Sequence, residues 1–342
     1  MALSESDPAG AAALFERAFR IDNSLAAAAY DAGVLHERLG EVDRARDAYG
    51  RALAAVPDFE AASLNLTRLR LRAGQAEEAE ADLRARAAAH PEAVGLRNQL
   101  VEVLLATGRL DAAEQEARRI LKSDEHDIRA MVNLATAYSL EGRQELARMV
   151  LENARQIAPG DPVVWNRLGM VELQLGARAQ ALEHFRKAAE LGESYPEGHV
   201  NYGAMLVEAE AFADAVKHLE LAVKHAPGSS AAHLNLGNAY RGAKAFEKAE
   251  QAYQRALEID PGLGDAWFDL GLLYLDGEKP GLPTAARLER AIALLDRYAA
   301  AGGADPKLSQ YRRDASVQLD KERRRLAREE RDRLRAPSPE NR

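Results

Sequence analysis

Large apolar residues and small residues recur along this chain with a period of 34 residues. One copy reads Trp165-x2-Leu168-Gly169 and then Ala181-x3-Phe185-x2-Ala188, and the copies after it follow in phase. Apolar positions spaced by three and four residues lie on one face of an α-helix, so each copy predicts two amphipathic helices. A fixed period of this length is typical of a solenoid, in which each unit buries its apolar face against the next.

The copies start at residues 26, 60, 94, 128, 162, 196, 230 and 264. Position 8 of the successive copies reads Gly33, Thr67, Val101, Ala135, Gly169, Gly203, Gly237 and Gly271. Position 20 reads Ala45, Ala79, Ala113, Ala147, Ala181, Ala215 and Ala249, and position 32 is proline at Pro57, Pro91, Pro159, Pro227 and Pro261. These residues resemble the tetratricopeptide repeat family. The resemblance implies an all-α fold: a right-handed superhelical solenoid of antiparallel helix pairs with a C-terminal capping helix.

The third copy departs from the pattern at three residues. Arg97 stands where a large apolar residue is expected, and Val101 and Ile120 stand at small positions. Small residues let the two helices of a unit approach each other closely. We therefore expect this copy to be helical but less ideally packed than the others.

The N-terminal end does not begin with a whole repeat. Positions 20, 24 and 27 of a preceding copy are matched by Ala11, Phe15 and Ala18. Residues 1–25 are therefore interpreted as a partial repeat that has only its second helix, and Asp7-Pro8 is a good start for that helix. We expect Met1 to begin a fragment of a longer protein; the alternative is that the lone helix is the native N-terminal cap.

The array itself is assigned to residues 26–303, with seven full repeats and an eighth that a turn-rich insertion interrupts at 276–283. Residues 304–335 predict a last helix, apolar at first and then rich in charges. Its first part is interpreted as the cap that covers the exposed face of the last repeat. Residues 336–342 are predicted to be a disordered tail.

Composition changes this picture little. The chain is 47% hydrophobic and 29% charged, and no apolar run approaches a membrane span, so we expect no membrane insertion. It has no cysteine, which excludes disulfides and thiolate chemistry but fits a reducing or an oxidising compartment. The net charge is −8, yet residues 306–342 carry twelve basic and seven acidic residues, so the body of the chain carries −13.

The sequence contains no arrangement that indicates catalysis, a metal or a cofactor. His184 and His218 share repeat position 23, and His199 and His233 share position 4. A histidine that recurs at one repeat position is interpreted as a packing residue. No HExxH motif, glycine-rich phosphate loop or Ser/His/Asp arrangement is present. We therefore expect no enzyme activity, no cofactor and no metal.

Polar residues recur on the face of the first helices that lines the concave groove in the resembled family. Position 6 reads Asp31, Asn65, Gln99, Asn133, Arg167, Asn201, Asn235 and Asp269. Asparagine is a poor helix former, and its side chain can pair with both the N–H and the C=O of an extended peptide. The predicted peptide-groove residues are Tyr30, Asn65, Arg68, Gln99, Asn133, Arg167, Met170, Asn201, Asn235 and Asn238.

This asparagine series resembles the one in the superhelical repeats of the O-linked N-acetylglucosamine transferase, which grips peptide backbone. We expect the asparagine side chains to face water when no ligand is bound; the alternative is that they bond neighbouring repeats or water. Acidic groups on the ligand would be selected by Arg68 and Arg167. Basic groups would be favoured by Glu37, Glu102, Glu208 and Asp269.

The dicarboxylate clamp, by which members of the resembled family hold chaperone C-termini, is not matched. The nearest approach is Asn98, Glu102, Asn133, Val163 and Arg167. It lacks the clamp lysines, and Glu102 would repel a carboxylate, so an Hsp70 or Hsp90 tail is not the expected partner. Nucleic acid is not expected either, because the body is acidic and the final helix alternates arginine with Glu and Asp.

The sequence thus predicts a non-catalytic scaffold that binds an extended peptide or a helix of a protein partner in the concave groove. Two alternatives stay open: the substrate-recruiting arm of a truncated enzyme, such as an O-GlcNAc-type glycosyltransferase, or a structural subunit of a bacterial envelope or motility assembly. The expected compartment is the cytoplasm, or the periplasm or envelope if an N-terminal signal has been removed. The sequence favours no oligomeric state.

Overall fold

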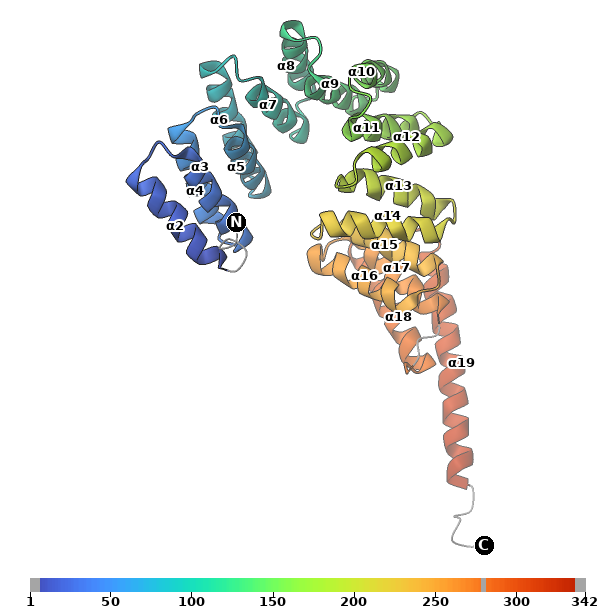
Figure 1. Ribbon diagram of the computed structural model, residues 1–342. Helices are drawn as coiled ribbons and strands as arrows, with labels where there is room; N and C mark the ends of the chain where they lie inside the picture. The colour runs from blue at the N-terminus through green and yellow to red at the C-terminus, as the bar shows by residue number, and fades with distance from the viewer. Residues whose placement is uncertain (1–6, 278–280, 336–342) are drawn as a thin grey trace. The chain divides into compact units, whose positions relative to one another are not determined.

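The computed structural model describes residues 7–277 and 281–335. They form eighteen helices and, within these two ranges, no strand (Figure 1). The chain divides into two compact units, Met1–Pro159 with Gln174–Gly176, and Gly160–Leu173 with Ala177–Arg342. The predicted all-helical array of helix pairs is confirmed. The tail predicted at 336–342 and part of the predicted insertion, 278–280, lie outside the described residues.

The helices alternate with short turns along both units. The N-terminal unit contains α2 Pro8–Ile21, α3 Ala26–Arg38, α4 Val42–Ala55, α5 Glu60–Arg72, α6 Ala76–Ala89, α7 Val94–Ala106, α8 Leu110–Ser123, α9 Ile128–Leu140 and α10 Gln144–Ile157. The helices that follow are α11 Pro162–Gln174, α12 Arg178–Leu191, α13 Pro196–Glu208, α14 Phe212–His225, α15 Ser230–Gly242, α16 Phe246–Ile259, α17 Gly264–Asp276, α18 Thr284–Ala300 and α19 Leu308–Arg335. From α3 onward, each repeat contributes one 13-residue first helix and a longer second helix.

The two helices of a repeat are held together by the small residue at position 8. A Cβ built on Gly33 would lie 2.6 Å from the ring of Tyr49, and one on Gly237 would lie 2.5 Å from the ring of Tyr253. Both tyrosine rings are fully buried. The absence of a side chain therefore lets a large residue at position 24 fill the space between the paired helices.

The third repeat reverses this arrangement. Val101 stands at position 8, but position 24 holds Ala117, and both residues are fully buried together with Ile120. Arg97 at position 4 forms an ion pair of 2.8 Å with Glu116 on the second helix. The bulk at this contact has therefore moved from the second helix to the first, and the expectation that this repeat packs less ideally stays a prediction.

The turn between the two helices of a repeat has a left-handed residue at position 15. Glycine occupies it in the first five repeats, with φ between 71° and 79°, but Glu210 (φ 57°) and Lys244 (φ 60°) occupy it in the next two. In each turn the N–H of the residue that follows the left-handed residue bonds the carbonyl five residues back, as from Ala211 to Leu206 at 2.9 Å. This is the Schellman arrangement that ends a helix through a left-handed residue.

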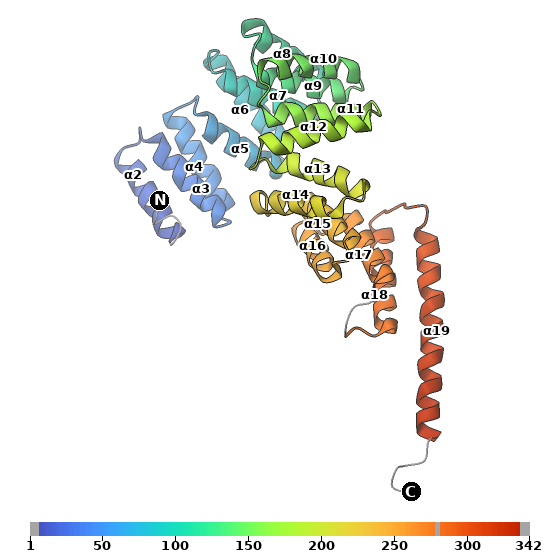
Figure 2. The ribbon, with the colours of Figure 1, turned by 45° about the vertical axis from the view of Figure 1, so that its right-hand side comes forward.

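The last helix covers the final repeat with its first part, residues 308–319. Ala315 and Leu319 pack on Leu288 of α18, whereas the described side chains of residues 323–334 are exposed. In both views α19 runs on beyond α18 (Figures 1 and 2). The predicted capping helix is therefore confirmed for its apolar part.

Gly33→Leu and Gly50→Leu test the packing register with the same change in two helices of one repeat. Leucine at residue 33 meets the buried ring of Tyr49 and should cost about 1–3 kcal/mol or more in the free energy of unfolding. A Cβ at residue 50 meets no atom within 4 Å, so leucine there should raise stability by about 0.5–1 kcal/mol, since glycine is a poor helix former. Urea unfolding measures both, and equal effects would contradict the assignment.

Candidate functional site

A hydrogen bond between side-chain amides links consecutive first helices in the N-terminal unit. Nδ2 of Asn133 on α9 donates to Oδ1 of Asn98 on α7 at 3.3 Å, and to its backbone carbonyl at 3.4 Å. Asn98 in turn donates to the carboxylate of Asp127 at 3.2 Å. Asn133 is only 6% exposed and Asn98 only 2%. The expectation that Asn133 faces water is therefore wrong, and its side chain joins neighbouring repeats.

The side chain of Gln99 also joins neighbouring repeats. Its Oε1 accepts from the hydroxyl of Ser63 at 2.7 Å, and its Nε2 donates to the backbone carbonyl of Glu60 at 3.0 Å. Gln99 is 2% exposed, so both polar ends of its side chain are satisfied inside the protein. It does not lie on an open groove surface.

Three predicted residues do come together at the start of the array. Nδ2 of Asn65 lies 3.5 Å from Oη of Tyr30, and Nη2 of Arg68 donates to Oδ1 of Asn65 at 3.4 Å. Arg68 also forms an ion pair of 2.6 Å with Glu37. Burial alone would raise the pKa of Glu37, but the hydrogen bond and charge of Arg68 outweigh burial and lower it. The charge of Arg68 is thus neutralised within the protein by Glu37.

The amide link recurs in the C-terminal unit, where it is half-buried. Nδ2 of Asn201 on α13 donates to Oδ1 of Asn166 on α11 at 2.8 Å, and Nδ2 of Asn166 donates to Oη of Tyr195 at 3.2 Å. Burial raises the pKa of Tyr195 to about 12, so its hydroxyl keeps its proton at neutral pH. These bonds hold the carboxamide of Asn201 in one orientation.

Asn235 and Asn238 behave differently from Asn201. Nδ2 of Asn235 donates to the carbonyl of Ala231 in its own helix at 3.0 Å. The residue at position 5 of the preceding repeat is Val200, which has no polar group to receive it. Oδ1 of Asn238 accepts from the hydroxyl of the buried Tyr253 at 2.6 Å, so Asn238 supports the packing of that ring.

One groove in the C-terminal unit brings together three of the predicted residues: Arg167, Met170 and Asn201. It lies along the first helices α11, α13 and α15, and its volume is about 480 Å³. The groove is lined by Val163, Asn166, Arg167, Met170, Tyr195, Pro196, Glu197, Val200, Asn201, Ala226, Ser229 and Ala231. Most of these residues occupy repeat positions 2, 5, 6 and 9 on the first helices. We call it the α11–α13–α15 groove.

Arg167 is the distinctive charge of this groove. Its buried Nε has no hydrogen-bond partner within the described ranges, and its Nη1 lies 3.9 Å from the sulfur of Met170. Other charges named from the sequence are paired. The ion pairs are Arg68–Glu37 (2.6 Å), Arg129–Glu102 (2.7 Å), Arg241–Asp269 (3.3 Å) and Arg178–Glu208. Arg68 and Arg167 were the two arginines expected to select acidic groups on a ligand. Arg68 is paired with Glu37, so Arg167 remains the candidate for that role.

The recurrent histidines are packing residues. Nε2 of His199 lies 3.0 Å from the carbonyl of Glu193, and Nε2 of His233 lies 3.1 Å from that of Pro227. A carbonyl can only accept, so each Nε2 donates. Trp267, at the same repeat position, donates Nε1–H to Pro261 at 3.0 Å. A ring N–H at position 4 therefore anchors the turn that precedes its own repeat.

The ring at position 4 also packs on the residue at position 23. His199 stacks on His218 with centroids 5.3 Å apart, and Trp165 lies 5.5 Å from His184. The two Nδ1 atoms of His199 and His218 are 3.1 Å apart. Since Nε2 of His199 carries a proton, its Nδ1 accepts from Nδ1–H of His218 in the neutral pair.

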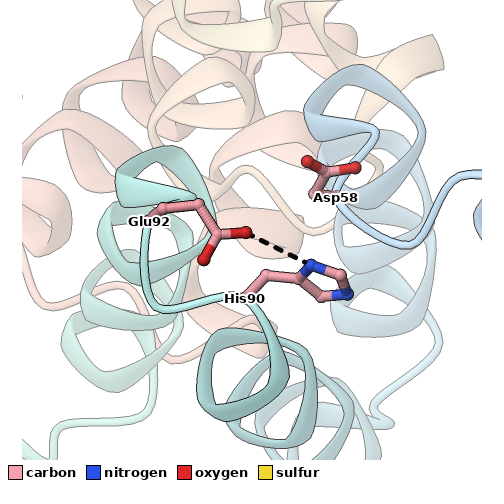
Figure 3. Close-up of side chains that lie close together, drawn as sticks. All are labelled: Asp58, His90 and Glu92. Carbon is pink, nitrogen blue, oxygen red and sulfur yellow. Dashed lines mark ion pairs between the residues drawn. The ribbon is translucent and has the colours of Figure 1, made fainter.

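Asp58, His90 and Glu92 form a cluster that sequence reasoning missed (Figure 3). They come from two turns between repeats, and one ligand atom from each lies within 4.8 Å of the others. Nδ1 of His90 and the carboxylate of Glu92 are 3.4 Å apart. Such a set offers three ligand atoms to a divalent cation. Both carboxylates are exposed, and a surface His–Glu ion pair accounts for the geometry equally well, so we assign no metal to it.

These features define the protein as an α-solenoid scaffold of stacked helix pairs with a groove along its first helices. Models of the tetratricopeptide repeat match residues 2–66, 70–138, 163–194 and 230–263, which together make up more than half of the chain. The chain belongs to the tetratricopeptide repeat family. Repeats of this family generally serve as scaffolds for protein–protein interaction and typically have no catalytic role.

Relatives and similar structures share parts of this array. The chain is 28% identical over 177 residues to the human protein O-mannosyl-transferase TMTC1, and 30% identical over 128 residues to the type IV pilus assembly protein PilF of Pseudomonas aeruginosa. These matches cover 51% and 37% of this chain but only 20% and 51% of the relatives. The crystal structure of the APC/C hetero-tetramer Cut9-Hcn1 has a TM-score of 0.63 at 17% identity, and the match covers 87% of this chain and 56% of that chain. It shows the same fold. In the part of the chain that the structure describes, no helix has both the length and the apolar character to cross a bilayer.

Asn133→Ala and Asn235→Ala separate the two kinds of asparagine. Alanine at residue 133 removes a buried link and leaves the amide oxygen of Asn98 unpaired, which should cost about 0.5–1.5 kcal/mol in the free energy of unfolding. Alanine at residue 235 should be close to neutral, since the lost bond lies within one helix and alanine is the better helix former. Chemical denaturation provides both values. A neutral Asn133→Ala would refute the structural role of the amide link.

The His199–His218 pair predicts a loss of stability in mild acid. Burial lowers the pKa of both imidazoles; Asp214 works against this at His218, and Lys217 adds to it. A histidine in the unfolded chain has a pKa of about 6.5 and binds protons first, so stability is fully present above pH 6.5 and falls as the pH drops toward the lowered folded pKa. Thermal melts from pH 7.5 to 5 measure the slope. In His218→Phe, which keeps an aromatic ring but loses the ionisable group, the slope should be smaller; an unchanged slope would contradict the assignment.

Proposed function

We infer that this protein is a non-catalytic scaffold that binds an extended peptide segment of a protein partner in the α11–α13–α15 groove. The observation that carries this proposal is Arg167, a cation that lines the groove and whose buried Nε has no hydrogen-bond partner among the described residues. A half-buried guanidinium pays a desolvation cost that a ligand carboxylate or carbonyl would offset. An acidic group on the peptide is the partner that suits it.

Asn201 supplies the complementary group for a peptide backbone. Its Nδ2 is already engaged with Asn166, so its amide oxygen is the atom left to accept a peptide N–H. Arg167 lies in the same groove and donates. An acceptor and a donor on neighbouring first helices match the alternating N–H and C=O groups of an extended strand. The hydrogen bonds from Asn201 to Asn166 and from Asn166 to Tyr195 would orient the acceptor before the ligand arrives, which lowers the entropy cost of binding.

Apolar residues in the groove provide room for an anchor side chain. Met170 is 39% exposed, and Val163 and Val200 are half-buried beside it. A flexible thioether adapts to ligand side chains of different shapes. Glu197 also lines the groove, so a basic residue on the peptide would be favoured at that side. The proposed ligand is thus an extended segment with an acidic residue and an apolar anchor.

The relatives bear on the two alternatives without favouring either over the scaffold. The relative named as an O-mannosyl-transferase fits the proposal of a repeat arm attached to an enzyme, and the relative named as a pilus assembly protein fits the proposal of an envelope subunit. We place the scaffold in the cytoplasm by default, and in the periplasm or envelope under the second alternative.

Arg167→Glu tests the groove against Arg313→Glu, a change of the same kind at an exposed position on α19. A library of displayed twelve-residue peptides is selected on the wild-type protein, and the affinities of the selected peptides are measured by fluorescence polarisation. Peptides that bind the groove should carry an acidic residue and lose about tenfold or more in affinity for Arg167→Glu, because an attractive contact becomes repulsive. Arg313→Glu should not affect them.

Asn201→Ala provides the second measurement on the same peptides. Loss of one backbone contact should weaken binding by about twofold to tenfold. If the selected peptides bind Arg167→Glu and Asn201→Ala as tightly as the wild type, while both variants melt normally, this groove is not the peptide site.

A further inference from the structure

A second groove in the C-terminal unit lies between α16, α17 and α18, away from the groove on the first helices. Its volume is about 490 Å³. It is lined by Gln254, Leu257, Glu258, Trp267, Leu270, Arg290, Ala293, Leu294 and Arg297. We call it the α16–α18 groove. It borders the second helices of the last two repeats, which do not contribute to the α11–α13–α15 groove.

The floor of the α16–α18 groove is apolar and well packed. Leu257, Leu270 and Leu294 are only 4–8% exposed, so their side chains are held by the packing around them. Trp267 is half-buried and forms one wall, held in place by its N–H bond to the carbonyl of Pro261. A fixed indole beside a leucine floor suits an apolar or aromatic side chain of a ligand.

The rim of the groove carries two arginines that face no carboxylate. The guanidinium of Arg297 lies 4.7 Å from the ring centroid of Trp267, and that of Arg290 lies 5.2 Å from that of Tyr274. Neither arginine forms an ion pair with any residue that the structure describes. The carboxylate on the groove, Glu258, is paired with Arg255 at 2.8 Å. The net charge that the rim offers to a ligand is therefore positive.

The spacing of the two arginines sets the spacing of their ligand groups. Arg290, Ala293, Leu294 and Arg297 lie on one face of α18. Seven residues of helix rise by about 10 Å. An extended chain in the polyproline II conformation advances about 3.1 Å per residue and has three residues per turn, so two residues three apart lie on the same face and span about the same length. Two carboxylates three residues apart in an extended peptide would meet the two guanidinium groups.

We propose that the α16–α18 groove binds an extended acidic peptide segment that has two carboxylates three residues apart and an apolar or aromatic residue between them. The carboxylates pair with Arg290 and Arg297, and the intervening side chain lies on Leu257, Leu270 and Trp267. The arginines already stack on aromatic rings, so little side-chain entropy is lost when they pair. This site is separate from the α11–α13–α15 groove, and either can exist without the other.

The experiment uses a twelve-residue fluorescein-labelled peptide whose centre reads Asp-Leu-Phe-Glu. A matched peptide with Asn-Leu-Phe-Gln removes the charges, and a third with Lys-Leu-Phe-Lys reverses them. The protein variants are the double change Arg290→Glu/Arg297→Glu and the control Arg313→Glu/Arg324→Glu, which makes the same charge change at two exposed positions of α19. Thermal melts establish that each variant is folded.

The acidic peptide should bind the wild type, and the neutral peptide should bind about tenfold or more weakly. The double reversal should lose the acidic peptide and gain the lysine peptide, whereas the control variant and Arg167→Glu should bind like the wild type. Affinity should fall as salt rises from 50 to 300 mM, since the pairs lie at the rim. In a Trp165→Phe background Trp267 is the sole tryptophan, and its fluorescence should change on binding because the peptide covers its ring.

Equal binding of the acidic and neutral peptides, or unchanged binding by the double reversal, would overturn the proposal. So would failure of the double reversal to bind the lysine peptide. If the double reversal does not fold, Arg297→Gln applies the same test with one charge removed, and unchanged affinity again overturns it. Loss of binding in Arg167→Glu would instead assign the peptide to the other groove.

Discussion

The structure depends on one close approach, between the backbone at position 8 of a repeat and the large side chain at position 24. Rings or branched chains occupy the space that a Cβ would need at Gly33, Gly169, Gly203 and Gly237. This contact brings the paired helices together and sets how each first helix is rotated about its axis. That rotation decides which positions meet the next repeat and which line a groove. Val101 with Ala117 shows that the constraint concerns the sum of two volumes and not the identity of either residue.

The same rotation explains why some asparagines at position 6 bond the preceding repeat and another bonds its own helix. Position 6 of one repeat lies beside position 5 of the repeat before it. Where position 5 carries a polar group, as Asn98 and Asn166 do, the asparagine bonds to it. Where position 5 is Val200, the asparagine turns to its own helix. One pair of neighbouring positions therefore decides between a structural bond and a side chain that a ligand could use.

The 34-residue period was sufficient to predict the helices, their pairing and the capping part of the last helix, because all three follow from repeated local packing. The groove could be predicted only by position. Arg167, Met170 and Asn201 do line one groove, but Gln99 and Asn133 are buried, since that outcome depends on Ser63 and Asn98 in the repeat before.

Two further features of the structure could have been predicted from the sequence. Glycine at position 15 in five repeats marks a backbone conformation and not a packing contact. Residues at positions 4 and 23 contact each other, and they change type together from repeat to repeat. They form an ion pair in Arg97–Glu116 and a pair of stacked rings in His199–His218. Pairs of this kind are recognised by comparing two positions across repeats. The carboxylate pairing of Arg68 involves residues on two different helices and could not be read from either position alone.

The uneven amide links have a mechanical consequence. Between α11 and α13 the repeats are joined by a directional bond as well as by apolar contacts, whereas between α13 and α15 the corresponding asparagine bonds its own helix. Apolar contacts resist separation but tolerate sliding, since they have no preferred direction. The joint between α13 and α15 therefore depends on its apolar contacts, without a directional amide bond from Asn235 to the preceding first helix. A ligand along the first helices could then be accommodated by a small sliding movement at this joint.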